Sequence, residues 1–246
     1  MQIQEFFSKA KKICLVFFVI FCVSYLIISL RQRFVGDDAF LLDYPEVVFK
    51  GDLSIDREMA ITDIKDVLNK HNLLSNPKSF SVDVDEVKDD FLQLSWIKNI
   101  AVVKEYPSKL LLVIEPKNII AYMFNNDEYF PVDEMGNIIP ISVDYKSGLI
   151  ISGEGANENL LDFLMVLKKY PKIMEKVVYL QFINGLRWNV FLYAIEDGIV
   201  IKLDNEDFEM GLQKIERLDD YQDLLKRNIS EIDVRDINRL LVKQRN

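Results

Sequence analysis

Side chains suited to catalysis or metal binding are scarce in this chain. It has 246 residues but one histidine, His71, and both cysteines, Cys14 and Cys22, fall in one uncharged apolar run. One histidine without cysteines outside that run does not supply the His and Cys ligands of a zinc site. A histidine at the end of a predicted helix favours a contact with the negative C-terminal end of that helix. We therefore expect no metal, no cofactor and no catalytic residue.

Two short patterns resemble functional loops but lack the rest of their motifs. Asp83 and Asp85 begin like a calcium loop, yet the twelfth position is Leu94 rather than Glu. Residues 153–155, Gly-Glu-Gly, precede a predicted helix as an anion-binding nest does, but no basic residue lies close by. The short motifs of serine hydrolases, zinc proteases and P-loop proteins are absent. A membrane-tethered hydrolase with a Ser/Lys pair stays open as an alternative, although no motif favours it.

An uncharged apolar run at residues 13–30 predicts a membrane-spanning helix. Its length as a helix is about 27 Å, close to the thickness of the bilayer hydrocarbon core. A buried core helix of this length normally has a polar face, and a cleaved signal peptide normally ends at small residues, whereas Arg31-Gln32-Arg33 follows here. We expect an uncleaved anchor after a cytoplasmic tail at residues 1–12, with a linker at 31–44 and the rest outside.

The charge differs between the two sides of this run. Residues 1–30 carry a net charge of +2, whereas the remainder carries −11. Such an acidic exterior part is not suited to binding nucleic acid as its main partner.

Residues 45–115 have the pattern of a strand, two helices and two strands. The first strand, at 46–50, ends at Gly51, where a positive φ is expected. Ser54 or Asp56 caps a helix that runs to about Lys70, and Asp83 caps a second helix. A hairpin follows, entered through Trp96 and turning at Tyr106-Pro107, with apolar residues alternating in its strands.

Residues 116–246 are richer in strand signals. We predict a hairpin that turns at Gly136 between 129–133 and 137–140, and a helix at 158–170 stopped by Pro171. Further elements are strands at 177–182, 188–193 and 199–203, a helix at 208–226, and strands at 229–235 and 239–243. The predicted fold class is α+β: a single transmembrane helix, a βααββ domain, and a mostly antiparallel β domain with two helices.

The motifs along both parts resemble the FtsQ/DivIB family of bacterial cell-division proteins. Trp96, the Tyr106-Pro107 turn and Glu115 resemble the end of that family's POTRA domain. Asp133 with Gly136 matches an Asp-x-x-Gly turn, Trp188 opens a Trp-led strand, and residues 232–235 match an Asp-Leu-Arg signature. The proline that usually follows the closing Glu is shifted to Pro116. The resemblance covers nearly the whole chain and implies a POTRA domain at 45–115 and a C-terminal β domain at 116–246.

The resemblance implies a non-catalytic scaffold of the division machinery at the inner-membrane septum. The partners it implies are FtsB-like and FtsL-like coiled-coil proteins and, through them, the septal peptidoglycan synthase complex. A different POTRA-bearing, membrane-anchored secretion or assembly component is the alternative scaffold.

The last strand is the predicted partner-binding surface, because a strand that closes a sheet often leaves backbone groups open for pairing. The resemblance also points to this strand and to the helix at 208–226. The residues expected to bind are Asp236, Asn238, Arg239, Leu240, Leu241 and Val242. Those expected to be structural are Gly51, Trp96, Pro107, Gly136, Trp188, Asp233 and Arg235.

Overall fold

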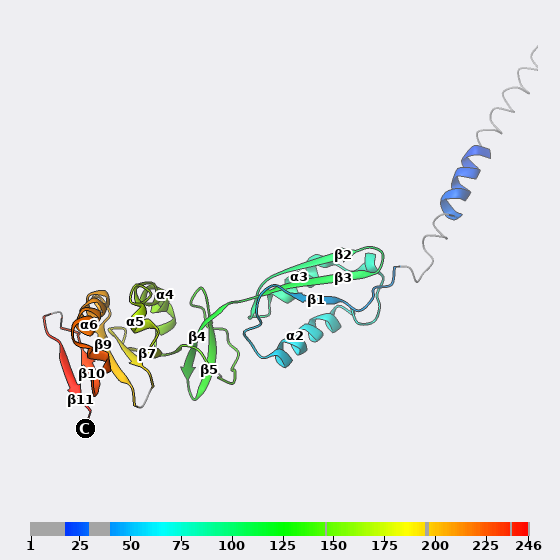
Figure 1. The fold of residues 1–246 in the computed structure, drawn as a ribbon. Helices are drawn as coiled ribbons and strands as arrows, with labels where there is room; N and C mark the ends of the chain where they lie inside the picture. Colours follow the sequence, from blue (N-terminus) through cyan, green and yellow to red (C-terminus); the bar gives the residue numbers. More distant parts are fainter. Residues whose placement is uncertain (1–17, 30–39, 146, 195–196, 237, 246) are drawn as a thin grey trace, which may run out of the picture. The chain divides into compact units, whose positions relative to one another are not determined.

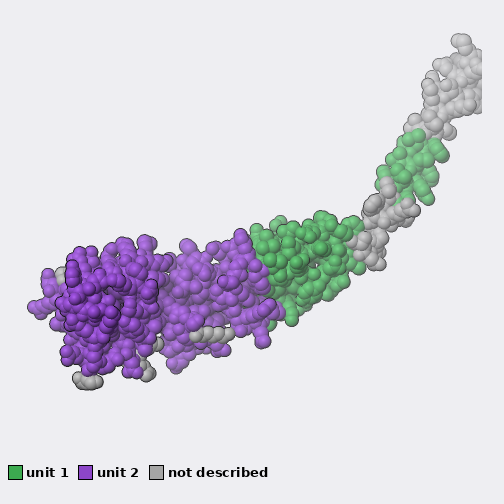
Figure 2. All heavy atoms as spheres, viewed as in Figure 1, with its two compact units in different colours: residues 1–48, 62–92, 100–114 green, residues 49–61, 93–99, 115–246 purple. Residues whose placement is uncertain are grey.

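The computed structural model describes residues 18–29, 40–145, 147–194, 197–236 and 238–245. These form two compact units, coloured green and purple in Figure 2. The first unit falls within residues 1–48, 62–92 and 100–114, and the second within 49–61, 93–99 and 115–246.

Only part of the predicted membrane span can be described. Residues 18–29 are helical, whereas 13–17 and 30 lie outside the described residues. Among the helices of the described part, none is both long and apolar enough to cross a membrane. The predicted tail at 1–12 and most of the predicted linker also lie outside the described residues.

The predicted strand–helix–helix–strand–strand order is confirmed. The elements are β1 (Glu46–Phe49), α2 (Arg57–Lys70), α3 (Val84–Leu92), β2 (Ile97–Glu105) and β3 (Lys109–Pro116), with a 3-10 turn η1 (Ser79–Ser81) before α3. The strands form a sheet in the order β1-β3-β2 (Figure 1).

The helix starts follow from the capping residues. Asp56 Oδ1 accepts hydrogen bonds from the N–H groups of Glu58 and Met59, at 2.9 and 3.0 Å. Asp83 does the same at the start of α3, at 3.0 Å from Asp85 N and 3.3 Å from Glu86 N. Each cap satisfies N–H groups that have no partner within the helix.

The second unit is built around a sheet of eight strands. Its strands are β4 (Ile119–Asn125), β5 (Glu128–Asp133), β6 (Ile150–Ser152), β7 (Val177–Ile183), β8 (Arg187–Leu192), β9 (Ile199–Asp204), β10 (Ile229–Asp233) and β11 (Leu241–Gln244). The order across the sheet is β11-β10-β9-β8-β7-β6-β4-β5. Four neighbouring pairs are antiparallel, and three are parallel: β4 with β6, β6 with β7, and β9 with β10. The sheet is therefore mixed: antiparallel pairs are the majority, as predicted, but three parallel pairs were not expected.

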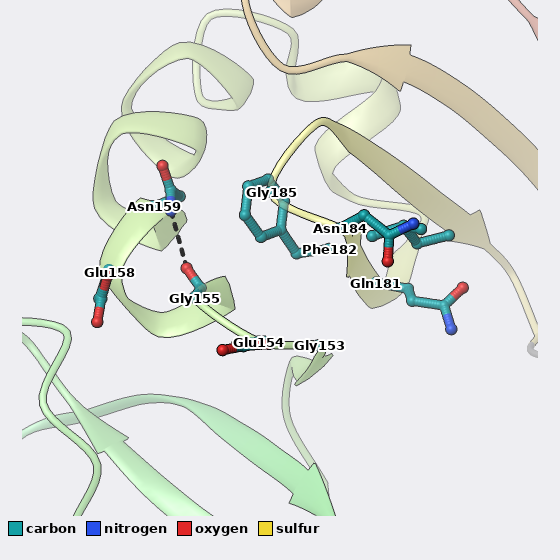
Figure 3. A pocket seen from close by; sticks show the side chains of 10 residues that line it. Gly153, Glu154, Gly155, Glu158, Asn159, Gln181, Phe182, Asn184 and Gly185 are labelled. Carbon is teal, nitrogen blue, oxygen red and sulfur yellow. Dashed lines mark hydrogen bonds between the residues drawn. The ribbon is translucent and has the colours of Figure 1, made fainter.

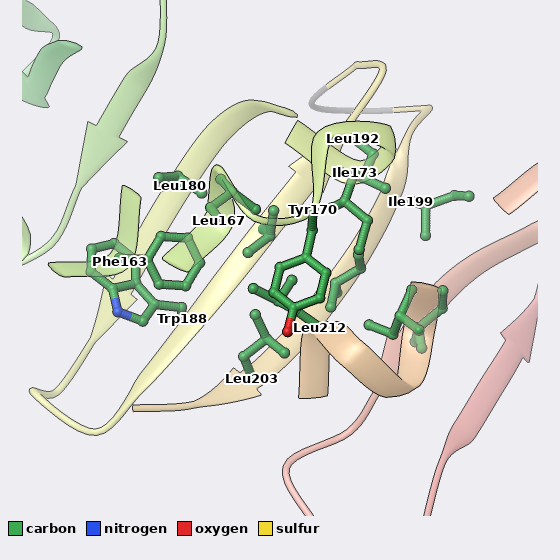
Figure 4. Close-up of a cluster of buried hydrophobic side chains, with 14 of the residues drawn as sticks. Phe163, Leu167, Tyr170, Ile173, Leu180, Trp188, Leu192, Ile199, Leu203 and Leu212 are labelled. Atoms are coloured by element: carbon green, nitrogen blue, oxygen red, sulfur yellow. The ribbon is translucent and has the colours of Figure 1, made fainter. Parts of the chain in front are cut away.

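Helices α4 (Ala156–Leu167), α5 (Pro171–Met174) and α6 (Phe208–Gln222) supply the apolar cover of this sheet. Figure 4 shows their buried side chains meeting those of the strands. Trp188 is fully buried, with its ring 4.7 Å from that of Phe163 and 4.5 Å from that of Phe182. Alternate positions on β8 and β9 complete this core, as expected for a sheet covered on one face.

Three local predictions are corrected. The helix predicted at 208–226 ends at 222, because Asp223 adopts a left-handed φ of 48° before a 3-10 turn, η2 (Leu224–Lys226). Pro171 begins the short helix α5 rather than only stopping α4, since proline suits a first helical turn. The main partner of β5 is β4, and residues 137–140 make only one bridge to it, between Val132 and Ile138.

Candidate functional site: the open edge of the large sheet

Strand β11 lies at one end of the eight-stranded sheet and has a neighbour, β10, on one side only. All four of its residues are exposed, and the side chains of Leu241 and Val242 are 64% and 41% exposed. Exposed apolar side chains on an edge strand are unusual, because such an edge can pair with other chains. This edge is therefore the first candidate for an interaction site.

The backbone groups that face away from the sheet can be assigned. Arg245 N donates to Asn228 O at 3.1 Å, and Lys243 O accepts from Ser230 Oγ at 3.4 Å. Successive residues of a strand direct their N–H and C=O groups to opposite sides. Since residues 243 and 245 face β10, the N–H and C=O groups of Val242 and Gln244 face outward.

The opposite edge of the sheet, β5, is covered by its own chain. Asp133 N donates to Asn137 O at 2.9 Å. Pro131 O and Tyr129 O accept hydrogen bonds from the N–H groups of Ile139 and Val143, at 2.8 and 2.9 Å. The backbone groups along that edge are thus occupied, and of the two ends of the described sheet β11 is the open one.

A shallow hollow flanks β11 on each face. One, of about 350 Å³, is lined by Asp233, Arg235, Asp236, Arg239 and Leu241. The other, of about 390 Å³, is lined by Leu224, Arg227, Asn228, Ile229, Val242, Gln244 and Arg245. Side chains of an added strand alternate between two faces, so both hollows are placed to receive them.

The turn before β11 is held by its own polar groups. Asp236 Oδ1 accepts from Asn238 N at 2.9 Å, and Asp236 O accepts from Arg239 N at 3.0 Å. Leu240 is half-buried and packs against the core. Of the six residues predicted to bind a partner, only Leu241 and Val242 lie in the strand.

Asp233 and Arg235 form an ion pair beside this edge. Arg235 Nε lies 2.9 Å from Asp233 Oδ1, and Arg235 Nη2 also bonds Asp233 Oδ2. The bonded guanidinium lowers the pKa of the Asp233 carboxyl below its usual value, despite partial burial. The carboxylate therefore stays charged, and the pair fixes the end of β10 where the chain turns towards β11.

The residues predicted to be structural are placed as follows. Trp96 and Trp188 are buried, at 1% and 0% exposure. Gly51 and Gly136 have positive φ values of 112° and 81°, which favour glycine. Pro107 lies in the turn between β2 and β3.

Asp133 makes more structural contacts than its Asp-x-x-Gly motif indicated. Its side chain is 3% exposed, and Oδ1 accepts from Met135 N and Asn137 N at 2.9 Å each. Lys117 Nζ lies 3.3 Å from Oδ2. Burial acts to raise the pKa of Asp133, but the hydrogen bonds, those from Asn137 and Met135 first, outweigh it and the pKa is lowered. The motif predicted a turn but gave no signal of the Lys117 pairing, which is distant in sequence.

The loop at Gly153-Glu154-Gly155 leads into α4, as Figure 3 shows. It borders a shallow hollow of about 780 Å³, and Asn159 Nδ2 donates to Gly155 O at 2.9 Å. The exposed carboxylates of Glu154 and Glu158 also line this hollow. Negative charge at this helix start disfavours an anion, so the hollow does not support an anion-binding site.

The described residues contain no cluster of three or more His, Cys, Asp or Glu side chains that could hold a metal ion. His71 contacts a neighbouring helix instead: its Nε2 lies 2.7 Å from Asp90 Oδ2, which also pairs with Lys70 Nζ at 2.6 Å. The cluster joins the end of α2 to α3.

Two sequence families match the chain. The family described as "POTRA domain, FtsQ-type" matches residues 52–115, and the one described as "Cell division protein FtsQ/DivIB, C-terminal" matches residues 121–235. Together the matched ranges cover more than half of the chain.

Similar proteins carry the name "Cell division protein FtsQ". The protein of Rickettsia typhi is 28% identical over 199 residues, covering 80% of this chain and 71% of its own length. The protein of Rickettsia prowazekii is 29% identical over 199 residues, which again cover 80% of this chain and 71% of its own length. A solved structure of the major extracytoplasmic domain of DivIB from Geobacillus stearothermophilus matches 44% of this chain and 95% of its own, at 15% identity and a TM-score of 0.31.

Proposed function

The chain belongs to the FtsQ/DivIB family of cell-division proteins, and we propose that it acts as a non-catalytic scaffold that recruits and regulates septal peptidoglycan synthesis. The observation that carries this proposal beyond the family is the open edge at β11. Its outward backbone groups, at Val242 and Gln244, can pair with an extended segment of another protein. The exposed side chain of Leu241 can make apolar contacts with that segment, and the two flanking hollows can receive its side chains.

We propose that the edge receives an FtsB-like coiled-coil protein, which in turn brings an FtsL-like protein and the septal synthase complex. Strand addition suits such a partner because its main-chain bonds supply affinity while alternate side chains supply specificity. The predicted site residues Asp236, Asn238 and Arg239 would then border the added strand rather than pair with it.

We also propose that residues 13–30 anchor the chain in the inner membrane at the septum, with residues 1–12 in the cytoplasm and the rest in the periplasm. The support is the uncharged run flanked by lysines on its N-terminal side. Protease added to spheroplasts should digest the C-terminal part and spare a tag at the N-terminus. A protected C-terminal part would contradict this topology.

Residues 45–115 and 116–246 are proposed to fold as a POTRA domain and a separate β domain. The support is that one βααββ order ends at Pro116 and a second sheet begins at Ile119. Limited proteolysis should yield two resistant fragments that meet near residue 116. Cleavage within either range, at the same protease concentration, would contradict this division.

The strand-addition proposal is tested by comparing Val242→Pro with Val242→Ala. Both variants lose the valine side chain, but only proline removes the outward N–H, which the edge position tolerates within the protein itself. The proline variant loses one main-chain hydrogen bond to the partner and the close packing around that bond. Its affinity for the FtsB-like partner should therefore be about tenfold lower than that of the alanine variant.

Proline at Leu241 is a less suitable test, because the N–H of residue 241 faces β10 and its loss would disturb the protein's own sheet. Affinity is measured with the full-length chain in detergent, and circular dichroism confirms that both Val242 variants remain folded. Equal affinities for the alanine and proline variants would show that the outward backbone of this edge takes no part in binding.

A further inference from the structure

Three strongly exposed aromatic side chains lie at one end of the first unit. Within residues 40–116, Tyr44, Phe80 and Tyr106 are 65%, 60% and 65% exposed, and the other aromatic residues there are half-buried or buried. Large exposed aromatic side chains gathered at one place mark an interaction surface more often than chance exposure does.

Hydrogen bonds join the three segments that carry these rings. Ser79 N donates to Phe40 O at 2.7 Å, and the rings of Phe40 and Phe80 meet edge to face at 6.4 Å. Asp43 N donates to Ser108 O at 2.8 Å, which ties the segment before Tyr44 to the β2–β3 turn. In Figure 1 this turn and the chain that enters β1 lie at the same end of the three-stranded sheet. We call this end, with Tyr44, Phe80 and Tyr106, the aromatic pole.

The aromatic pole is also where the chain arrives from the apolar run. Only residues 31–39 separate that run from Phe40. From residue 30 to Phe40 such a segment spans at most about 36 Å when fully extended, so Phe40 cannot lie further than that from the end of the run. A short tether keeps the local concentration of the pole at the attachment surface high, so even a weak surface contact is populated.

The charges around the pole are balanced. Asp43 and Glu105 are exposed there, as is Lys109, and Lys78 Nζ lies 5.9 Å from the centre of the Phe80 ring. Lys104, whose Nζ donates to Val82 O, and the exposed Asp83 add one charge of each sign, so three acidic and three basic groups give no net attraction to an anionic surface. Amphipathic rings without net charge suit the interface between lipid headgroups and hydrocarbon, where tyrosine and other aromatic side chains are enriched.

We infer that the aromatic pole docks on the bilayer surface beside the anchor, with Tyr44, Phe80 and Tyr106 entering the headgroup region. This inference rests on the proposed anchor at residues 13–30. Docking would fix the height and tilt of the first unit above the membrane, rather than leaving the unit on a loose tether.

The test uses the full-length chain in phosphatidylcholine nanodiscs that contain lipids with a nitroxide quencher at a shallow or a deep position. Cys14 and Cys22 are replaced by Ser, and a fluorophore is attached at Lys109→Cys beside the turn. The matched control is a fluorophore at Leu92→Cys, which is 39% exposed and is the last residue of α3, before the start of β2. Residues 97 and 105 at the two ends of β2 are about 26 Å apart, so the control reports from the other end of the sheet.

Shallow quencher should quench the fluorophore at residue 109 at least twofold more than the fluorophore at residue 92. Phe80→Ser combined with Tyr106→Ser should reduce that quenching to the level of the control, whereas raising the salt from 50 to 500 mM should leave it unchanged. Equal quenching at residues 109 and 92 would overturn the docking inference, as would quenching that the double serine variant leaves unchanged.

A fluorophore on the native Cys22, with Cys14→Ser, separates this inference from the proposed anchor. Quenching of Cys22 by the deep quencher without quenching at residue 109 overturns docking and leaves the anchor standing. No quenching at either position overturns both. Shielding of residue 109 only after a coiled-coil partner is added would assign the aromatic pole to a protein contact and also overturn docking.

Discussion

Replacing Asp133 by Asn should destabilise the second unit with little change in side-chain shape. The carboxylate is buried, and its two oxygens are shared among Met135 N, Asn137 N and Lys117 Nζ, with Asn137 Nδ2 at 3.4 Å from Oδ2. An asparagine oxygen can still accept from the two backbone N–H groups. Its NH₂ group then faces the lysine and the Asn137 amide, so donors meet donors.

The size of the loss follows from those contacts. A hydrogen bond to a charged group contributes about 1.5–3 kcal/mol, and the long contact to Asn137 Nδ2 adds little. Asp133→Asn should therefore cost roughly 2–3 kcal/mol, or about 4–12 °C in Tm for a unit of this size. Asp133→Ala should cost more, because it also leaves two backbone N–H groups without an acceptor.

The effect should depend on pH in one direction. The folded-state pKa of Asp133 is lowered, so the charged form stabilises the fold above the unfolded-state pKa of about 3.9, and this contribution is lost as pH falls through the folded-state pKa. Asparagine does not titrate. The difference in stability between the wild type and Asp133→Asn should be constant from about pH 6 to 8 and shrink below about pH 4.

Thermal unfolding followed by circular dichroism, from pH 3 to 8, measures both effects. Glu134 supplies a matched comparison, since it is more exposed and pairs with Lys98 at 2.7 Å, and Glu134→Gln should cost clearly less. If Asp133→Asn melts with the wild type at pH 7, or if the difference persists unchanged at pH 3, the assignment of Asp133 as a charged structural anchor is wrong.

Other substitutions test the packing. Phe91→Ala, at a fully buried site, should cost about 3–5 kcal/mol and unfold the helix pair, and amide exchange in α3 as slow as in the wild type would contradict this. Gly211→Ala should cost roughly 1–2 kcal/mol despite its better helix propensity, because the new Cβ would lie 2.6 Å from Leu203 Cδ2; an unchanged Tm would mean that α6 can shift. Trp188→Phe should cost about 1–3 kcal/mol through lost volume alone, since Nε1 has no hydrogen-bond partner among the described residues; weaker partner binding at unchanged stability would instead indicate an interface role.

Local patterns predicted the first sheet and its helices well. The caps at Asp56 and Asp83 and the alternation at Leu110, Leu112 and Ile114 are short-range signals, and all are seen in the structure. Between the strands predicted at 177–182 and 188–193, Asn184 and Gly185 both have positive φ, as is usual for an Asn-Gly hairpin turn.

The elements that the local patterns did not predict depend on long-range strand pairing or on turns without the usual glycine. The β4–β5 hairpin turns at Asn126 and Asp127, both at positive φ and without glycine, so the sequence lacked the usual signal. Strand β6 has only three residues, and its place depends on parallel pairing with β4 and β7. The parallel pair β9–β10 is joined through α6, and this strand–helix–strand order is the usual crossover between parallel strands.

The sequence predicted a strand at the edge of the sheet, whereas partner binding at this edge stays a prediction. The edge position predicted for the last strand is confirmed by the strand order, in which β11 has only β10 beside it. The sequence did not reveal that the strand begins at Leu241, because the preceding residues are drawn into a turn by Asp236. It also gave no direction for the backbone groups, which depends on the register with β10.

The two edge strands of the large sheet differ in how far the rest of the chain covers them. This difference favours another protein as the partner of β11 over a second copy of this chain. The β5 edge is closed by residues 137–143, whereas β11 is left open with Lys243 and Arg245 near its end. Antiparallel pairing of two β11 strands centred on residue 243 would place Lys243 opposite Lys243, which disfavours self-association in that register. A partner strand without a positive charge opposite Lys243 meets no such repulsion. The edge can therefore stay open in the free protein without joining copies of the chain, and it remains available to the partner proposed for it.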